Sequence, residues 1–550
     1  MKKIYLLMLL GIVFNNLQSQ NFNWAKREGL YQYDYGYGIA NDNAGNVYVA
    51  GKYEQNANFS GTILPNQGNH DIFLAKYDAN GTLGWVSTGG GGSGDYAHAL
   101  ACDGTNNLYL AGEIEYYAPN NIIVFPGSSI TLVPLGSNDA VITKYDFNGN
   151  LLWAKSGGGY NDDKAQAVTY DNAGNVYISG FFTDTAYFGS STIYGNGNRD
   201  IFIAKYDMNG VFQWVRNAGG SGRDEAKSMK CDAAGNVYVC GMYNTGAVFG
   251  TQTYTCTPGY AEVFLAKYSP IGTLLWVKTA GGAYDDVAWA LTMDNAGKIY
   301  MTGEFNASAY FGSTQLFTAG NADVFVTCYD ASGNVQWAKR GGGAFIDRAR
   351  GIGCDGTTIF ITGQFGFSAS FGSGNLTAPD SSDIFFASLD NAGNFIRSAS
   401  VGGVPDSLET LGYESGIAIC AEASGNVYAT GSLLNGGVFG NIVLSPYSRT
   451  DVFVTKISQL TGVNTLISPN EFVFIYPNPT EGNLVIDFVQ PVNQKIEMSI
   501  INCFGQVIDK RTEINSGVNI DLSEQESGVY FIELRKEEKN ILRKKIIIQK

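Results

Sequence analysis

The stretch Asp171-Asn172-Ala173-Gly174-Asn175-Val176-Tyr177-Ile178-Ser179-Gly180 decides the fold, because variants of it occur seven times along the chain. Each copy ends at a glycine, and successive closing glycines are 61, 68, 61, 62, 60 and 68 residues apart. They are Gly51, Gly112, Gly180, Gly241, Gly303, Gly363 and Gly431. A repeat of this length, rich in strand formers and in Gly, Asn and Asp, predicts one four-stranded β unit per repeat and an all-β chain.

Each unit contains four predicted strands in a fixed order. In the third unit, Asp163 opens a strand of small and apolar residues over 163–170, and the Asn-rich turn leads to a second strand over 176–180. The third strand covers 200–206, and the fourth carries Trp214. Tight Asn/Gly turns supply the positive φ that hairpins need, so the four strands form a meander.

The two ends of the repeat region complement each other. In the seventh unit the third strand, 451–457, is not followed by a fourth strand that carries a tryptophan. Trp24, by contrast, precedes the first complete unit. Pairing these two segments would complete the seventh unit and remove an open sheet edge. The sequence therefore predicts a seven-bladed β-propeller over residues 21–458, closed by the N-terminal strand.

A recurring pattern carries a family resemblance: Phe-Gly, then Asp-x-Phe-x-Ala-Lys-Tyr-Asp-x-x-Gly-x-x-x-Trp, then Gly-Gly…Asp, then Asp-x-x-Gly-Asn-Val-Tyr-x-x-Gly. It resembles the bacterial seven-bladed β-propeller family with SBBP-type repeats, and the resemblance implies the fold without implying an activity. The tryptophan segment is also similar to the docking repeat of quinone-dependent dehydrogenase propellers. We interpret its Trp as packing between blades and expect no cofactor.

After a linker over 459–471, the composition changes and residues 472–550 form a second domain. This segment resembles the type IX secretion C-terminal sorting domain of Bacteroidetes through Tyr476, Pro477, Asn478, Pro479, Gly482, Gly505, Gly528 and Tyr530. The resemblance implies transfer across the outer membrane by the type IX machinery, to the cell surface or the medium. Alternating segments such as 484–488 and 495–501 independently predict a small β-sandwich.

The first 19 residues have the pattern of a secretory signal peptide, with Lys2 and Lys3 before an apolar run and a small residue at Ser19. No later stretch reaches the roughly 18 apolar residues of a transmembrane helix. The net charge of −15 argues against nucleic acid as a partner, because phosphate binding needs clustered cations. We expect an exported monomer whose ligand is a glycan or another surface protein.

Disulfide bonds and metal sites are not predicted. The chain has eight cysteines, but Cys102, Cys231 and Cys354 occupy equivalent positions in different blades, too far apart to be linked, although Cys231 and Cys240 share a hairpin. With only two histidines, a multi-histidine metal site or a Ser-His-Asp triad is not expected. Turn aspartates such as Asp171 offer too few oxygens for a calcium loop.

The first strands begin with acidic residues, which we expect to form a ring at the channel mouth: Asp34, Asp95, Asp163, Asp224, Asp286, Asp347 and Glu414. Such a ring could bind a cation or a polar ligand. The alternative is that each carboxylate caps backbone N–H groups in its own loop, which recurrence in every blade favours.

Three features break the repeat symmetry. His98 follows Asp95 on a predicted channel strand, and two insertions on one face carry Tyr116, Tyr117 and Tyr413. Aromatic loops of this kind suit sugar rings. The leading hypothesis is a non-catalytic binding or adhesion module that uses this face. A carbohydrate-active hydrolase or lyase using channel carboxylates and a surface spacer without a ligand are the alternatives.

Overall fold

The computed structural model describes residues 21–458 and 473–549, except 31, 43, 117–121, 373, 379–381, 403–413, 435, 446–448, 477–479, 481, 489–495, 503–505, 513–517 and 537–538. The described residues form strands and turns and no helix, so the all-β prediction is confirmed. The chain divides into two compact units, Met1–Gln459 and Leu460–Lys550. The proposed signal peptide and the whole linker over 459–471 lie outside the described residues.

Unit 1 contains seven antiparallel meanders, counted over the described residues, which we number sheets 1 to 7. Sheets 1 to 3 consist of β2 (Tyr35–Asn41), β3 (Val47–Glu54), β6 (His70–Tyr77) and β7 (Leu83–Gly89); β8 (Tyr96–Cys102), β9 (Asn107–Glu115), β12 (Asn138–Asp146) and β13 (Leu151–Gly159); and β14 (Lys164–Tyr170), β15 (Val176–Phe182), β18 (Asp200–Tyr206) and β19 (Phe212–Ala218).

Sheets 4 to 7 have the same order. They consist of β20 (Glu225–Cys231), β21 (Val237–Tyr243), β24 (Glu262–Tyr268) and β25 (Leu274–Gly282); β26 (Val287–Met293), β27 (Ile299–Phe311), β28 (Thr314–Tyr329) and β29 (Val335–Gly343); β30 (Arg348–Cys354), β31 (Thr358–Phe365), β34 (Asp383–Asp390) and β35 (Phe395–Val401); and β36 (Ser415–Ala421), β37 (Val427–Leu434), β40 (Thr450–Ser458) and β1 (Asn21–Glu28).

Small hairpins lie between the second and third strands of most sheets. They are β4 (Ala57–Phe59) with β5 (Thr62–Leu64), β10 (Ile123–Val124) with β11 (Thr131–Leu132), β16 (Thr185–Phe188) with β17 (Ser191–Tyr194), β22 (Ala247–Phe249) with β23 (Gln252–Tyr254), β32 (Ser368–Phe371) with β33 (Gly374–Thr377), and β38 (Gly437–Phe439) with β39 (Ile442–Leu444). In sheet 5 the long strands β27 and β28 form this hairpin themselves.

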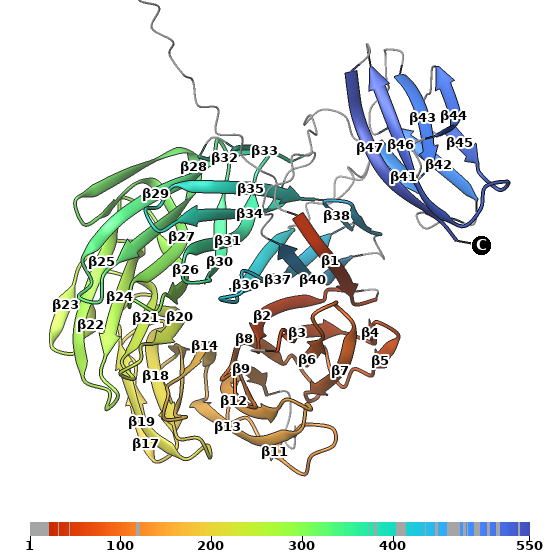
Figure 1. Ribbon diagram of the computed structural model, residues 1–550. Coiled ribbons are helices and arrows are strands. Elements are labelled where there is room, and N and C mark those ends of the chain that lie inside the picture. Colours follow the sequence, from red (N-terminus) through yellow and green to blue (C-terminus); the bar gives the residue numbers. More distant parts are fainter. Residues whose placement is uncertain are drawn as a thin grey trace, which may run out of the picture. The chain divides into compact units, whose positions relative to one another are not determined.

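The sheets of unit 1 have a propeller-like arrangement around a centre (Figure 1). The innermost strands contact one another in the order β2, β8, β14, β20, β26, β30 and β36, and β36 contacts β2. The N-terminal strand β1 pairs antiparallel with β40, so that Trp24 lies opposite Lys456. The N-terminal strand therefore supplies the outer strand of sheet 7.

The signature turn is held by its aspartate. Oδ1 of Asp171 accepts hydrogen bonds from the backbone N–H groups of Ala173 and Asn175, each 2.9 Å long. Oδ2 accepts from the Asn175 amide at 2.7 Å and from the Tyr177 hydroxyl at 2.8 Å. Gly174 completes the turn with a φ of 79°. This explains why Asp, Gly, Asn and Tyr recur together, and it supports the prediction that these aspartates are turn residues.

Apolar side chains of adjacent sheets share the hydrophobic core. One cluster joins Ala111 and Ile142 of sheet 2 with Ile178 and Phe202 of sheet 3. The tryptophan of one sheet then donates its indole N–H to a backbone carbonyl in the next sheet, at 3.0–3.2 Å. These pairs are Trp24 with Ala79, Trp85 with Phe147, Trp153 with Met208, Trp214 with Pro270, and Trp337 with Asn391. The prediction that Trp packs between sheets is confirmed.

Unit 2 consists of two sheets around one core. β41 (Val473–Tyr476), β42 (Asn483–Phe488) and β45 (Val518–Asp521) form one sheet, and β44 (Val507–Thr512), β43 (Ile496–Asn502), β46 (Gly528–Lys536) and β47 (Lys539–Ile548) form the other. Leu484 and Ile520 of the first sheet pack with Ile500 and Ile532 of the second. The two sheets therefore pack face to face.

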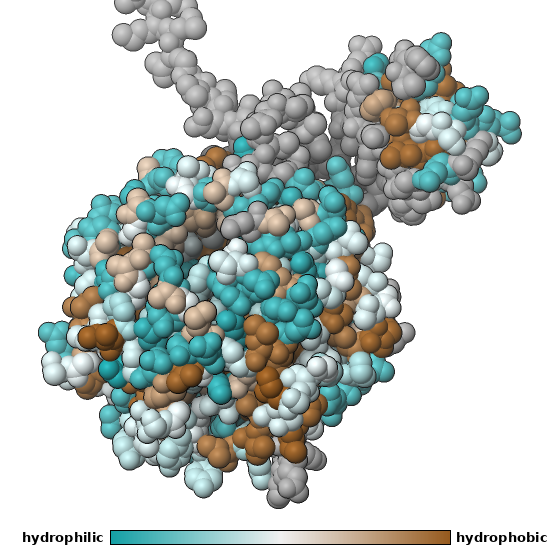
Figure 2. Space-filling view, turned by 60° about the horizontal axis from the view of Figure 1, so that its bottom comes forward, coloured by the Kyte–Doolittle hydropathy of each residue, from teal (hydrophilic) through white to brown (hydrophobic). Residues whose placement is uncertain are grey.

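Large hydrophobic side chains such as Leu152, Val211 and Ile271 are exposed, and on the face seen in Figure 2 hydrophobic residues form several separate patches among hydrophilic ones. Among the described residues, no helix could span a membrane.

Candidate functional site

Every innermost strand contains a β-bulge at the same place. In β14 the register shifts between Ala165 and Ala167, so Gln166 has no partner residue on β15. The other six innermost strands shift at the equivalent position. A bulge adds one residue to a strand and redirects its side chain. Each sheet thus presents one bulged residue, three positions after the acidic residue that precedes the strand.

The signature glycine makes room for this bulge. A Cβ atom on Gly180 would lie 1.8 Å from the carbonyl oxygen of Lys164 on β14, and the other six closing glycines show the same approach at 1.8–2.0 Å from their facing carbonyl. Only a residue without a Cβ fits at this separation. The glycine that ends each repeat signature is therefore required by the bulge on the neighbouring strand.

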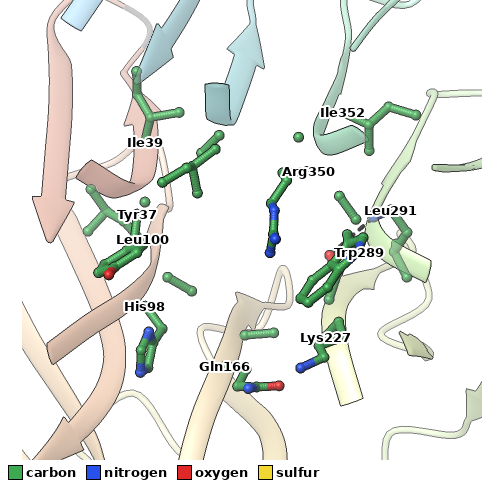
Figure 3. Close-up of a pocket in the computed structure, with 18 of the residues that line it drawn as sticks. Tyr37, Ile39, His98, Leu100, Gln166, Lys227, Trp289, Leu291, Arg350 and Ile352 are labelled. Carbon is green, nitrogen blue, oxygen red and sulfur yellow. Dashed lines mark hydrogen bonds between the residues drawn. The ribbon is translucent and has the colours of Figure 1, made fainter. Parts of the chain in front are cut away.

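The seven bulged residues converge on one cavity of about 260 Å³. We call them the central-ring residues: Tyr37, His98, Gln166, Lys227, Trp289, Arg350 and Ile417. The cavity touches all seven innermost strands. Figure 3 shows the side chain of Arg350 extending into it, with Tyr37 and His98 on one side and Trp289 and Lys227 on the other.

Two cations lie against the Trp289 ring. The guanidinium carbon of Arg350 is 4.2 Å from the ring centroid, and Nζ of Lys227 is 4.7 Å from it. Both are cation–π distances. The indole N–H of Trp289 is buried and has no hydrogen-bond partner among the described residues. Trp289 therefore holds two positive groups and leaves one donor unused.

The cations differ in their carboxylate partners. Lys227 forms an ion pair with Glu225, which Arg223 and Arg199 also contact at 2.5 and 2.6 Å. Burial would raise the pKa of Glu225, but these cations hold it at about 2. Arg350 forms no ion pair with any described residue; nearby Glu304, whose charge acts on Arg350, is paired with Arg348.

Lys230 adds a third cation to the cavity lining. Its side chain is exposed to the channel and forms no ion pair with a described residue. Enclosure by the surrounding strands lowers the pKa of Lys230, and it also lowers the pKa values of Lys227 and Arg350. None of the described residues lining the cavity is an aspartate or a glutamate. The cavity is thus positively charged in a protein of net charge −15.

The opposite wall is aromatic. The rings of Tyr35 and Tyr37 are stacked at 5.7 Å, and those of Tyr96 and His98 at 5.8 Å. Lys52 lies 5.2 Å from the ring centroids of both Tyr35 and Tyr96. The four rings of this group come from the innermost strands β2 and β8, and Lys52 comes from β3.

His98 is fixed by a buried carboxylate. Its Nε2 is 3.1 Å from Oε1 of Glu113, and Nζ of Lys164 is 2.6 Å from Oε2 of the same residue. Burial would raise the pKa of Glu113, but its contacts with His98 and Lys164 hold the pKa below its usual range. Glu113 therefore positions two side chains at the edge of the central ring.

The acidic residues of the predicted ring cap backbone N–H groups, which is the alternative that their recurrence in every blade favoured. Its six aspartates are fully buried, and each accepts two backbone N–H groups at 2.6–3.2 Å, as Asp163 does from Gly159 and Thr183. Glu414 is also buried. None of these residues lines the cavity. Their carboxylates hold the inter-sheet loops, because a buried backbone N–H must find an acceptor.

These aspartates also have raised pKa values. Burial raises the pKa of Asp163 and Asp286 to about 8, that of Asp34, Asp95 and Asp347 to about 7, and that of Asp224 to about 6. An acidic residue at the start of the third strand of a sheet lies close to several of these aspartates. A Cβ atom added to Gly158 would lie 2.5 Å from Asp139 Oδ1 and 2.9 Å from Asp163 Oδ2. The two carboxylates therefore lie beside the same point of the backbone. This proximity adds to the rise at Asp163.

The structure describes only part of the predicted loop face. Tyr116 is exposed, and its backbone N–H donates to Ser137. Tyr117 and Tyr413 lie outside the described residues, as do Pro477, Asn478, Pro479 and Gly505 of the sorting motif. The described cysteines are free thiols, including Cys231 and Cys240. The described residues contain no group of three or more His, Cys, Asp or Glu that could hold a metal.

Sequence reasoning identified His98 but missed the rest of the central ring. The signal was present: in all seven first strands, varied side chains stand one and three places after the acidic residue, separated by Gly or Ala, and all but Ser415 are larger than alanine or serine. If side chains alternated strictly along the strand, both positions would face the same side of the sheet. A single sequence does not show that a β-bulge interrupts this alternation.

In unit 2, residues 474–549 match the family of secretion system C-terminal sorting domains. The C-terminal unit is a sorting domain. The resemblance noted in the sequence is confirmed for this part of the chain, and it implies export by the type IX system to the cell surface or the medium. Within the sorting domain, Gly482 has a φ of 135°, and the Tyr530 hydroxyl donates to the carbonyl of Glu526 at 2.9 Å. Gly528 opens β46, and Tyr476 ends β41.

Two curated proteins are similar to the chain. An uncharacterized WD repeat-containing protein, L264 of Acanthamoeba polyphaga mimivirus, is 23% identical over 425 residues, covering 63% of this chain and 30% of that protein. The regulatory protein FlaEY of Caulobacter vibrioides is 25% identical over 257 residues, covering 44% of this chain and 26% of that protein. The chain thus spans less than a third of the length of either relative.

Solved structures show distant similarity. Quinohemoprotein alcohol dehydrogenase from Comamonas testosteroni has a TM-score of 0.35 at 11% identity, covering 84% of this chain and 80% of that one. A protein of unknown function from Bacteroides thetaiotaomicron has a TM-score of 0.30 at 10% identity, covering 80% and 73%.

Proposed function

We propose that the chain is an exported, non-catalytic binding protein: a closed seven-bladed propeller that takes its ligand in the central cavity and is delivered by its sorting domain. The pairing of β1 with β40 and the contact between β36 and β2 support closure of the ring. In a closed ring the cavity is bounded by seven rigid strands, so its side chains are held in place by the scaffold.

The identity of the central-ring residues is the observation that carries this proposal. The backbone position is equivalent in all seven sheets, yet it holds Tyr, His, Gln, Lys, Trp, Arg and Ile. The neighbouring positions keep Gly, Ala or Ser for close packing. A position with a purely structural role would keep one residue type, as the loop aspartates do. Seven different side chains around one cavity favour a single asymmetric ligand, and they argue against a surface spacer.

Binding is favoured over glycoside hydrolysis. Hydrolysis of this kind needs two carboxyl groups flanking the scissile bond. The aspartates that could supply them are engaged by backbone N–H groups, and the described cavity lining has no carboxylate. A glycan or the end of a surface polymer therefore remains the proposed type of ligand. We place its recognition at the central ring and not at the loop-face residues Tyr116, Tyr117 and Tyr413.

A binding screen with cleavage monitoring tests this function. The full chain would be titrated with neutral and acidic glycans while the products are followed by chromatography. Gln166→Ala removes a central-ring amide whose carbonyl oxygen is buried without a partner, and Gln213→Ala removes an exposed amide on the outer strand β19 as the control. We expect binding without products, weakened only by Gln166→Ala. Turnover of a glycan, or equal loss in both variants, would contradict the proposal.

Deletion of residues 474–549 tests the route of export. Cell fractionation should find the truncated protein inside the outer membrane and the full chain outside it. The control is Lys510→Ala, which changes an exposed side chain of the sorting domain. Equal export of the truncated and full-length chains would contradict delivery by this domain.

A further inference from the structure

We infer that the central cavity binds an oxyanion, such as the carboxylate of a small sugar acid, through Arg350, Lys230 and the indole N–H of Trp289. This inference rests on the proposed function, since it names the chemical class of ligand that the same cavity takes. It depends on three observations: hydrogen-bond donors of three side chains line the cavity, two cations form no ion pair with a described carboxylate, and the cavity is small.

The first observation concerns hydrogen-bond donors. Arg350 and Lys230 carry several N–H donors and no acceptor, and the Trp289 indole can only donate. All three line the cavity. The Trp289 N–H is buried without a partner among the described residues. An unused buried donor is costly, and a ligand oxygen would satisfy it.

The second observation concerns charge. Enclosed cations are unfavourable unless an opposite charge compensates them. Lys227 is compensated by Glu225, and Arg348 by Glu304. Arg350 lies against the Trp289 ring and, although it is near Glu304, forms no ion pair among the described residues, and Lys230 has none there either. The cavity therefore retains two positive charges that a bound anion would neutralise.

The third observation concerns size and position. A volume of about 260 Å³ lies below the roughly 300–1,000 Å³ of most drug-sized ligand pockets. The faces of Trp289 are approached by Lys227 and Arg350, so the ring is placed to orient the cations and not to stack on a sugar. The ligand is thus a small anion or the acidic terminus of a chain, with Gln166 and Tyr37 available for its hydroxyl groups.

Isothermal titration calorimetry of the full chain tests the inference. The probes are sodium glucuronate and glucose, which share a sugar ring and differ in the carboxylate, together with sodium sulfate and sodium phosphate at matched ionic strength. We expect one glucuronate per chain and no measurable binding of glucose. Equal affinity for sulfate or phosphate would also support an oxyanion site and would identify the charged group as the recognised part.

Variants connect the binding to these side chains. Arg350→Gln and Lys230→Gln should each weaken glucuronate binding at least tenfold, whereas Lys155→Gln, at an exposed lysine on the outer strand β13, should leave it unchanged. The melting temperature of unliganded Lys230→Gln should stay close to that of the wild type, because Lys230 is exposed and forms no ion pair with a described residue. If Lys230 instead stabilised the fold, the substitution would lower the melting temperature.

Two results would overturn the inference. Equal binding of glucose and glucuronate, sensitive to Gln166→Ala but not to Arg350→Gln, would refute the anion site and leave the central cavity as the binding site. Failure of all four probes to bind would also refute the anion site, while binding of another glycan that Gln166→Ala weakens would preserve the proposed function.

Discussion

A Cβ atom on Gly180 would lie 1.8 Å from the carbonyl oxygen of Lys164 on the facing strand. This approach accompanies the bulge that redirects Gln166 toward the cavity. Gly180→Ala should therefore displace β14, lower the free energy of unfolding by about 3 kcal/mol and weaken ligand binding in the central cavity. Urea unfolding and calorimetry on the same preparation measure the two effects.

Gly84→Ala is the matched control for this substitution. Gly84 lies on the outer strand β7, and a Cβ there would be 3.5 Å from its nearest neighbour, an ordinary contact distance. The change should leave binding intact and should alter stability by less than about 1 kcal/mol. If both glycine variants behaved alike, the link between the closing glycine and the bulge would be wrong.

The closing glycines show how far the sequence could be read. Their spacing predicted the repeat, the four strands and the pairing of Trp24 with the last third strand, because turn residues and period leave a local signature. These glycines are needed because a carbonyl on the facing strand approaches closely. This is a contact between strands, so it leaves no local signature in the sequence. Asp163 could be recognised as a loop cap because the residue recurs in every repeat, whereas the position of Gln166, Trp289 and Arg350 in one cavity depends on bulges that the sequence does not reveal.

The tryptophan contact between sheets should contribute to stability. The Nε1–H of Trp85 donates to the carbonyl of Phe147 in sheet 2 at 3.0 Å. Trp85→Phe keeps an aromatic ring but leaves this carbonyl without its donor, so we expect a loss of about 1–2 kcal/mol in the free energy of unfolding. Leu152→Ala, which truncates an exposed side chain on an outer strand, should have little effect in the same urea titration. Comparable losses in both variants would show that the indole bond has no special role.

The buried loop aspartates should be sensitive to loss of an acceptor. Asp163 accepts from Gly159 and Thr183 with its two oxygens. Asp163→Asn places an NH₂ group against one of these donors, which should cost roughly 1–3 kcal/mol. Asp184→Asn is the control, because Asp184 has a φ of 67° and asparagine tolerates this conformation. Thermal melting of the two variants would separate them, and an unchanged melting temperature for Asp163→Asn would refute the capping role.

The same aspartates predict an unusual pH dependence. Burial raises the pKa of Asp163 and Asp286 to about 8 and of Asp34, Asp95 and Asp347 to about 7, above the value of roughly 4 in an unfolded chain. Between these values the folded state binds more protons than the unfolded state. The free energy of unfolding should therefore fall as the pH rises from about 5 to about 8.

Urea titrations at pH 5 and pH 8 measure this dependence. His70 acts in the opposite direction, since burial lowers its pKa, but it is a single group. Asp146, which holds the turn between β12 and β13, has a pKa lowered by hydrogen bonds from Asn150 and Asn148, so it stays ionised throughout this range. Asp163→Asn should reduce the slope because it removes one titrating group. Greater stability at pH 8 than at pH 5 would contradict the prediction.

Anomalous diffraction from crystals soaked in sodium bromide would test the central claim most directly, because it locates an anion without assuming a ligand. The account predicts a bromide peak inside the cavity, beside the Arg350 guanidinium, which disappears in Arg350→Gln crystals. Bromide peaks on the outer surface together with an empty cavity, or a cavity peak that persists in Arg350→Gln, would contradict it.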